Sequence, residues 1–176
     1  MMRSRQPQIA VPLALALITL AGALLRVPGF LSHPVVLTEG TTYVTIARNL
    51  LAGHGYVGIL GAVEPFAPPL YPLLIALVAA LNGDALGSAR LISLLAGVAL
   101  VPAAYLLATW LFDRRAGLWT ALLVAGAPLL IVYSSLEWSE TLYALLLVLG
   151  LAWGWRAVQS GQGLSLIHIS EPTRPY

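Results

Sequence analysis

Two carboxylic acids are the residues of this sequence best suited to chemistry. Glu39 follows an apolar run in the stretch LTEGTTYVTIARNLLAGHGY, and Glu140 opens a second apolar run. An ionised carboxylate can orient a hydroxyl, accept its proton or hold a divalent cation. An acid at a helix start is also favourable without any function, because the helix dipole stabilises negative charge there. A chemical role and mere support of a helix start are therefore both open for Glu39 and for Glu140.

The elements that would position these acids are membrane helices. The chain has 59% hydrophobic and 9% charged residues, which does not allow a soluble globule with a polar surface. Cysteine is absent, which excludes a disulfide framework and a thiol nucleophile. The net charge of +2 gives no sign of nucleic-acid binding. We therefore predict an all-α fold, a polytopic bundle of transmembrane helices.

Four runs with few charges approach the length of about 20 residues that a helix needs to cross a bilayer. They lie near residues 9–26, 88–112, 116–136 and 139–157. A fifth run, residues 65–83, is interrupted by prolines, so we predict that it does not cross. The first run could also be a cleaved signal peptide, but the later spans favour an uncleaved anchor.

Positive charge predicts which ends of the spans lie together. Arg3 and Arg5 precede the first span, and Arg114 and Arg115 separate the second from the third, so all four are expected in the cytoplasm. Residues 27–87 then form an external segment with juxtamembrane helices. The same topology places four acids on the external side, where they could share one site. These acids are Glu39, Glu64, Glu137 and Glu140.

The external segment is predicted to contain an amphipathic helix that begins just after Glu39. Apolar side chains between Tyr43 and Leu51 recur with the spacing of one helical face. Such a helix is expected to lie on the outer membrane surface. The candidate caps are Thr41 or Thr42 at its start and Gly53 with Gly55 at its end.

Other polar residues carry weaker signals. Arg90, near the outer end of the second span, could bind a phosphate or extend its guanidinium to the lipid headgroups. His33 and His54 lie in the external segment but lack the spacing of a metal site. The sequence contains no glycine-rich phosphate loop, no Ser-His-Asp order and no zinc motif.

An ordered set of motifs resembles the N-terminal part of the GT-C membrane glycosyltransferases of family 39, which include protein mannosyltransferases and aminoarabinose transferases. The set consists of Glu39, Tyr43, IARNLLAGHGY, PPLYPLLIAL, ARLISLLAG, FDRRAG and LEWSETLYALL. The resemblance implies transfer of a sugar from a polyprenyl-phosphate donor to a lipid, glycan or protein acceptor. It also implies a bacterial inner membrane, a reaction on the periplasmic face and a cytoplasmic N-terminus.

The resemblance also implies roles for individual residues. Glu39 corresponds to an acid that activates the acceptor or binds a divalent metal cation, and Glu140 corresponds to a second acidic site position. The candidate substrate-binding residues are Tyr43, Tyr71 and Arg90. Two departures stand out: Glu39 occupies a position where aspartate is common, and Ala67 occupies one where a basic residue often precedes the proline pair.

Residues 1–163 are interpreted as the N-terminal part of such a transferase domain. The family continues through further spans, so the resemblance implies a fragment that does not turn over by itself. Residues 164–176 differ in composition and resemble a translated sequencing adapter, with a natural polar tail as the alternative. A transporter or channel segment, or a non-catalytic membrane scaffold, stays open as a different function.

Overall fold

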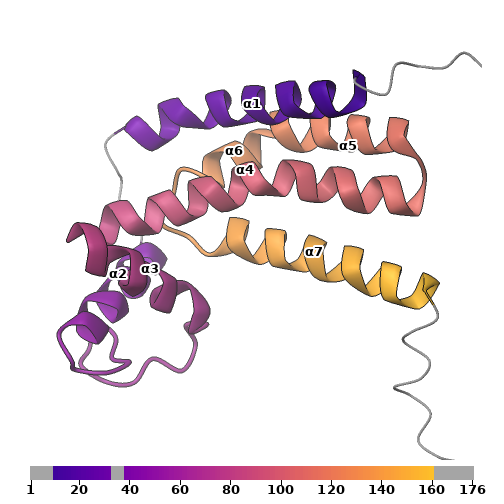
Figure 1. Cartoon of the computed structure of the whole chain (residues 1–176). Coiled ribbons are helices and arrows are strands. Elements are labelled where there is room, and N and C mark those ends of the chain that lie inside the picture. The colour runs from indigo at the N-terminus through magenta and orange to yellow at the C-terminus, as the bar shows by residue number, and fades with distance from the viewer. Residues whose placement is uncertain (1–9, 33–37, 161–176) are drawn as a thin grey trace, which may run out of the picture.

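The computed structural model describes residues 10–32 and 38–160, and this part of the chain is all-α (Figure 1). A single bridge between Val57 and Val63 is the one extended pairing among the described residues. The helices are α1 (Ala10–Leu31), α2 (Thr38–Leu51), α3 (Leu70–Asn82), α4 (Ala85–Leu111), α5 (Arg114–Gly126), α6 (Pro128–Tyr133) and α7 (Glu140–Gln159). The predicted all-α fold is confirmed. Arg3, Arg5, His33 and residues 164–176 lie outside the described residues.

Helix α4 is the centre of the bundle. Helices α1, α5 and α7 pack along it, and α2 and α3 pack beside its N-terminal end (Figure 1). Within the described residues, α1, α4 and α7 are long and apolar enough to cross a membrane. Their exposed leucines are suited to lipid contact, and α3, with 13 residues, is shorter than a span. A membrane helix bundle was the predicted architecture.

The first span differs from its predicted extent of residues 9–26. Helix α1 continues to Leu31, and Arg26 lies inside it with a side chain that is 0 % exposed. The charge of Arg26 was expected to end the first span at this residue. It does not, because the bundle itself supplies hydrogen-bond acceptors for the guanidinium.

The predicted third span, residues 116–136, was wrong as a single helix. Helix α5 ends at Gly126, and Ala127 takes an extended conformation with φ −65° and ψ 116° before α6 begins. The cause is Pro128, the first residue of α6, which has no N–H and whose ring would clash with the carbonyl one turn earlier. Helices α5 and α6 together cover the region where one continuous span was expected.

Helix α2 begins earlier than predicted. It starts at Thr38, so Glu39 lies in its first turn, and Thr42 is inside the helix, where its hydroxyl donates to the Thr38 carbonyl. The prediction that Thr41 or Thr42 caps the start was therefore wrong. The C-terminal end agrees with the prediction, since Gly53 and Gly55 have φ values of 78° and 81°.

The buried face of α2 also differs in part from the predicted one. Ile46 and Ala47 are buried as expected, but Val44 is buried and Leu51 is 47 % exposed. The reason is that α2 packs against two helices, α3 and α4, and so buries residues on more than one of its faces. This packing fixes α2 to the bundle through protein contacts.

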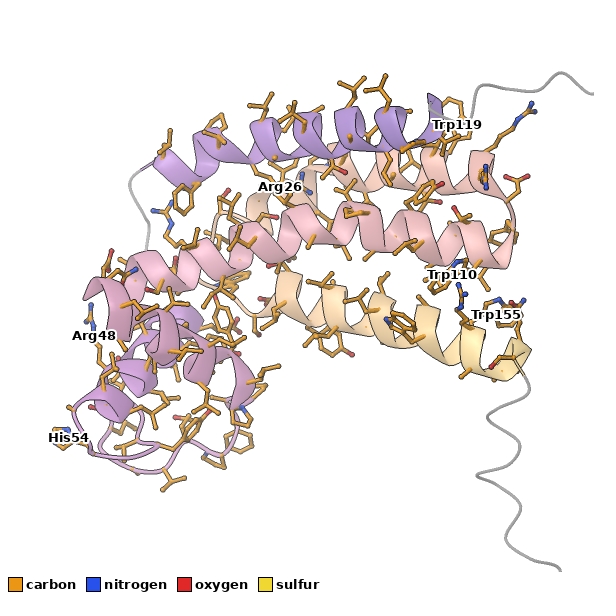
Figure 2. All side chains as sticks on the ribbon, viewed as in Figure 1. Arg26, Arg48, His54, Trp110, Trp119 and Trp155 are labelled. Atoms are coloured by element: carbon orange, nitrogen blue, oxygen red, sulfur yellow. The ribbon has the colours of Figure 1, made fainter. Side chains whose placement is uncertain are left out.

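The two ends of the bundle differ in chemistry. At the end opposite α2, the guanidinium of Arg156 lies 5.0 Å from the ring centre of Trp110, and Trp155 donates its indole N–H to the Trp110 carbonyl. Figure 2 shows Trp110 and Trp155 together at this end, far from His54. Arg114 and Arg115 begin α5 at the same end. Arg114, Arg115 and Arg156 lie at this end with Trp110 and Trp155, whereas Glu39, Glu64, Glu137 and Glu140 lie at the other end.

Candidate functional site

The candidate site lies at the end of the bundle where α2, α3 and the turn before α7 meet. Glu39 is exposed in the first turn of α2, and Tyr43 lies one turn further along the same helix. Positions four apart on a helix share a face, so both side chains point to the same side of α2. Both line a cavity of about 250 Å³, together with Glu64.

The loop between α2 and α3 places Glu64 in this cavity. Asn49 donates its side-chain amide to the Val57 carbonyl at 2.7 Å, and Tyr56 donates its hydroxyl to the Ala67 carbonyl at 2.7 Å. The first bond ties the loop to α2, and the second joins the beginning of the loop to its end. The cavity is therefore polar and is lined by the carboxylates of Glu39 and Glu64.

Two tyrosines connect α2 with the rest of the site. The rings of Tyr43 and Tyr71 meet edge to face, with centroids 5.2 Å apart and planes at 86°. The Tyr43 hydroxyl lies 3.2 Å from Ser139 Oγ, in the turn before α7. Tyr43 therefore contacts both α3 and the start of α7.

The Tyr71 side chain is 1 % exposed and ties three elements together. Its hydroxyl lies 3.0 Å from the Ala89 carbonyl and 2.8 Å from Ser93 Oγ, both in α4. Ser93 in turn donates to the Trp138 carbonyl at 2.8 Å. Burial raises the pKa of Tyr71, and the carboxylates of Glu137 and Glu140 raise it further, while the hydrogen bond with Ser93 opposes them. Tyr71 is thus a neutral, structural group close to two acids.

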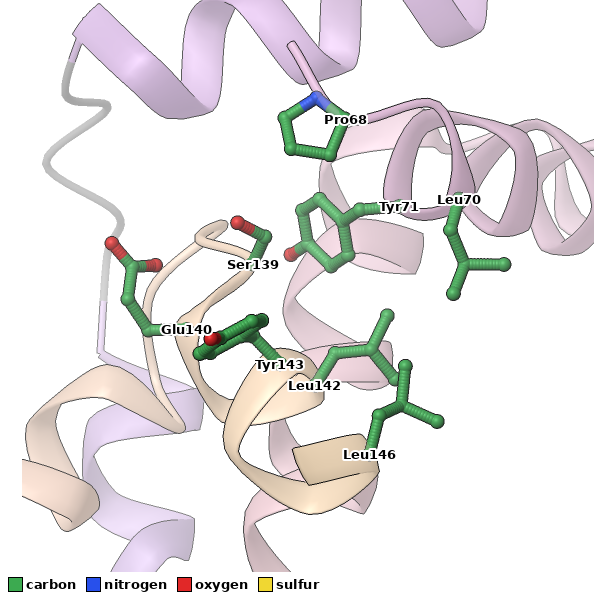
Figure 3. A pocket seen from close by; sticks show the side chains of 8 residues that line it. All are labelled: Pro68, Leu70, Tyr71, Ser139, Glu140, Leu142, Tyr143 and Leu146. Carbon is green, nitrogen blue, oxygen red and sulfur yellow. The ribbon is translucent and has the colours of Figure 1, made fainter. Parts of the chain in front are cut away.

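Glu140, Ser139 and Tyr71 line a second cavity, of about 210 Å³, between α3 and α7 (Figure 3). The rest of its wall is apolar and includes Leu142 and Leu146. The Glu140 carboxylate is in the first turn of α7, and Figure 3 shows it beside Ser139 at the polar rim of the cavity. Its Oε2 atom is buried without a hydrogen-bond partner within the described part of the chain. The two cavities are adjacent, since Tyr43 of one bonds to Ser139 of the other.

Glu137 received little weight from the sequence, yet its side chain is 0 % exposed. It packs against Gly40 in the first turn of α2. The Glu-x-x-Glu spacing of residues 137 and 140, directly before a span, was a usable signal for this pair. Burial of a carboxylate is costly unless it is paired or hydrogen-bonded, so the position of Glu137 depends on how α2 and this turn pack together.

Arg90 is held by backbone carbonyls. Its Nε donates to the Ser135 carbonyl at 3.0 Å, and its Nη2 donates to the carbonyls of Gly29 and Ser32 at 2.9 and 3.1 Å. The guanidinium also lies 5.6 Å from the ring centre of Phe30. Arg90 therefore joins α4 to the end of α1 and to the turn before α7. Its predicted role in binding substrate stays a prediction.

Comparison with known families identifies the chain. The sequence model of the family described as dolichyl-phosphate-mannose-protein mannosyltransferase matches residues 66–169. The chain belongs to this mannosyltransferase family. Neither the comparison with curated proteins nor the comparison with solved structures found a match.

Membership in the mannosyltransferase family confirms the resemblance to GT-C glycosyltransferases of family 39 and makes the chain part of a membrane glycosyltransferase. The matched residues include Tyr71, Arg90 and Glu140, whereas Glu39 and Tyr43 precede them. The structure nevertheless brings Tyr43 and Tyr71 into contact, so the candidate site contains residues of both the matched and the unmatched part.

A divalent metal at this end of the bundle would need oxygen donors. Glu39 and Glu64 line the same cavity and provide two carboxylates. Within the described residues, no three His, Cys, Asp or Glu side chains are grouped closely enough to hold a metal ion by themselves. Two carboxylates fit the way proteins bind Mg²⁺, in which waters and phosphate oxygens complete the coordination.

Proposed function

We propose that the protein transfers a sugar from a polyprenyl-phosphate donor to an acceptor at the end of the bundle formed by α2, α3 and the turn before α7. The observation that supports this proposal is the pair of adjacent cavities joined by the Tyr43–Ser139 contact. One is lined mainly by apolar side chains, and the other contains the carboxylates of Glu39 and Glu64. A lipid-linked sugar has the same two parts, an apolar chain and a polar head.

The apolar cavity suits the lipid end of the donor. Leu70, Leu142 and Leu146 line it between α3 and α7, and Leu70 and Leu146 are about half exposed at 47 % and 46 %. Such side chains contact an isoprenoid chain without loss of hydrogen bonds. Glu140, at the polar rim, is placed to accept hydrogen bonds from hydroxyls of the donor sugar.

Glu39 is proposed as the general base. Its carboxylate takes the proton of the acceptor hydroxyl while the hydroxyl oxygen forms a bond to the anomeric carbon of the sugar. The bond between that carbon and the phosphate oxygen breaks, and polyprenyl phosphate leaves with its electron pair. Tyr43 lies one turn along the same helix and is placed to orient the sugar through its hydroxyl. A divalent cation held by Glu39 and Glu64 would supply positive charge for the leaving phosphate.

The reaction is proposed on the external face of a bacterial inner membrane. The support for the external face is the charge distribution, because Arg114, Arg115 and Arg156 lie at the end opposite Glu39, and basic residues favour the cytoplasmic side. The N-terminus of α1 is at the same end as these arginines (Figure 1), which is consistent with a cytoplasmic N-terminus.

The proposal is tested with Glu39→Gln in the full-length protein, assayed in membranes with a polyprenyl-phosphate sugar. Loss of the base is expected to lower kcat by about 10²-fold to 10⁴-fold, with the amount of folded protein unchanged. The matched control is Asp113→Asn at the opposite end, where asparagine caps α5 as aspartate does. Unchanged sugar transfer by Glu39→Gln, or an equal loss in the control, would remove the assignment of Glu39.

A further inference from the structure

Arg26 is a buried charge for which the proposed reaction has no direct use. It lies in α1, is 0 % exposed and points into the bundle (Figure 2). Its guanidinium donates four hydrogen bonds. The acceptors are the carbonyls of Gly22 at 2.7 Å, Ala125 at 3.0 Å and Val124 at 3.2 Å, and Ser134 Oγ at 3.1 Å.

The break between α5 and α6 explains why an arginine is needed here. Pro128 has no N–H to donate to the Val124 carbonyl, and the extended Ala127 separates the last turn of α5 from α6. Carbonyls freed in this way inside a membrane bundle have no water to bond to. Arg26 donates to two of them from a neighbouring helix, and its planar guanidinium presents several donors in a fixed arrangement.

The surrounding helices leave room for this guanidinium. A Cβ atom at Gly22 would lie 3.1 Å from Ala125 Cβ and 3.4 Å from Arg26 Nη1. A Cβ atom at Gly97 in α4 would lie 2.8 Å from Ser134 Cβ and 3.4 Å from Arg26 Nε. Gly97 is therefore required for Ser134 to occupy its position, and Gly22 allows α1 to lie close to α5 beside the guanidinium.

Ser134 is the link from Arg26 to the candidate site. It follows α6 directly and is 0 % exposed, and the turn that it begins carries Glu137 and leads to Glu140 at the start of α7. The neighbouring residue Ser135 is held through its carbonyl by Arg90. Two arginines from two other helices thus fix the N-terminal side of one short turn.

We propose that Arg26 is a positioning residue for the transferase reaction. It fixes the break between α5 and α6, and through Ser134 it sets where the turn before α7 places Ser139 and Glu140. This inference rests on the proposed function, because Glu140 and the Ser139 contact are parts of the proposed site. Arg26 itself does not touch the substrate.

Kinetics in the full-length protein provide the first test. Arg26→Lys keeps a charge but offers one nitrogen for four acceptors. Ser134→Ala removes the acceptor of the Arg26 bond, together with the bond that Ser134 Oγ donates to the Leu130 carbonyl. Both are expected to lower kcat of the folded enzyme by about tenfold to a hundredfold, since displacement of Ser139 and Glu140 misaligns the donor sugar. The matched control is Ser160→Ala, whose hydroxyl donates to the Ala157 carbonyl at the far end of α7.

Thiol labelling provides a second readout that does not depend on activity. The sequence has no cysteine, so Ser139→Cys and His54→Cys each introduce a single thiol in it. With Arg26→Lys or Ser134→Ala added, the maleimide labelling rate in detergent is expected to rise at position 139 and stay constant at position 54. The rise reports release of the turn, whereas general loosening would change both rates.

Each outcome decides the proposal. Equal labelling at position 139 with and without Arg26→Lys overturns it, as does an unchanged kcat or a loss equal to that of Ser160→Ala. If Glu39→Gln leaves sugar transfer unchanged while position 139 still responds, the proposed function fails and only the hold of Arg26 on the turn stands. If Arg26→Lys does not fold, Ser134→Ala provides the same two measurements.

Discussion

The side chain of Glu137 packs directly on Gly40, so that a Cβ atom added at position 40 would lie 2.8 Å from both Cδ and Oε1 of the glutamate. Gly40 follows Glu39 in the first turn of α2, and Glu137 belongs to the turn that leads to Glu140. The two acidic segments of the candidate site therefore meet at a glycine. The absence of a side chain there is what allows α2 to approach the turn.

Gly40→Ala is expected to separate these two segments. The added methyl group collides with a buried side chain, and such overpacking costs about 1–3 kcal/mol of stability. Thermal unfolding in detergent measures the loss, and sugar transfer should fall with it. The matched control is Gly126→Ala, since a Cβ atom there has open space around it and alanine favours the helix. Equal stability of the two variants would contradict the contact.

Tyr71→Phe is expected to weaken the junction of α3, α4 and the turn before α7. The variant loses the hydrogen bonds of the Tyr71 hydroxyl to the Ala89 carbonyl and to Ser93, which lowers the free energy of unfolding by about 0.5–1.5 kcal/mol at neutral pH. Chemical unfolding of the two proteins in mixed detergent measures the difference. Ser93→Ala should give a loss of similar size, because Ser93 also bonds to Trp138.

The same tyrosine predicts how stability depends on alkaline pH. Burial raises its pKa in the folded protein above the ordinary value of 10.0, so the folded state keeps the proton longer than the unfolded state. The contribution of neutral Tyr71 to the free energy of unfolding is therefore full below pH 10 and is lost as the pH rises above that value. Unfolding measured at about pH 9 to 11 should show a steeper loss in the wild type than in Tyr71→Phe. Parallel curves would mean that Tyr71 is not held neutral by its surroundings.

Arg90→Lys separates a structural role of Arg90 from the predicted role in phosphate binding. Lysine cannot serve the three carbonyls that accept from Arg90, so stability is expected to fall by about 1–3 kcal/mol while the donor KM stays nearly constant. Unfolding and donor titration measure the two effects. The matched control is Arg48→Lys, because Arg48 is exposed on α2. A higher donor KM at unchanged stability would instead support phosphate binding.

The sequence predicted those parts of the candidate site that depend on the local spacing of apolar and charged residues. The spacing of apolar residues predicted α2, and charge at the span ends predicted that Glu39, Glu64, Glu137 and Glu140 would lie at one end. The pattern could not rank these acids, because burial depends on which surface covers them. Glu137 is the example: its sequence pattern ranked it below Glu39 and Glu140, but contact with Gly40 from another part of the chain buries it.

The sequence by itself determined that this chain forms apolar helices and that its four described glutamates lie at one end of the bundle, because hydrophobicity and charge act through composition and short-range spacing. Only the tertiary structure decided that Arg26 lies inside the bundle and that Arg90 bonds to backbone carbonyls. An arginine at a span end is expected to reach for the membrane surface, since burial of a lone charge is costly. Here carbonyls from residues far away in the sequence, freed by a proline or at a helix end, offset that cost.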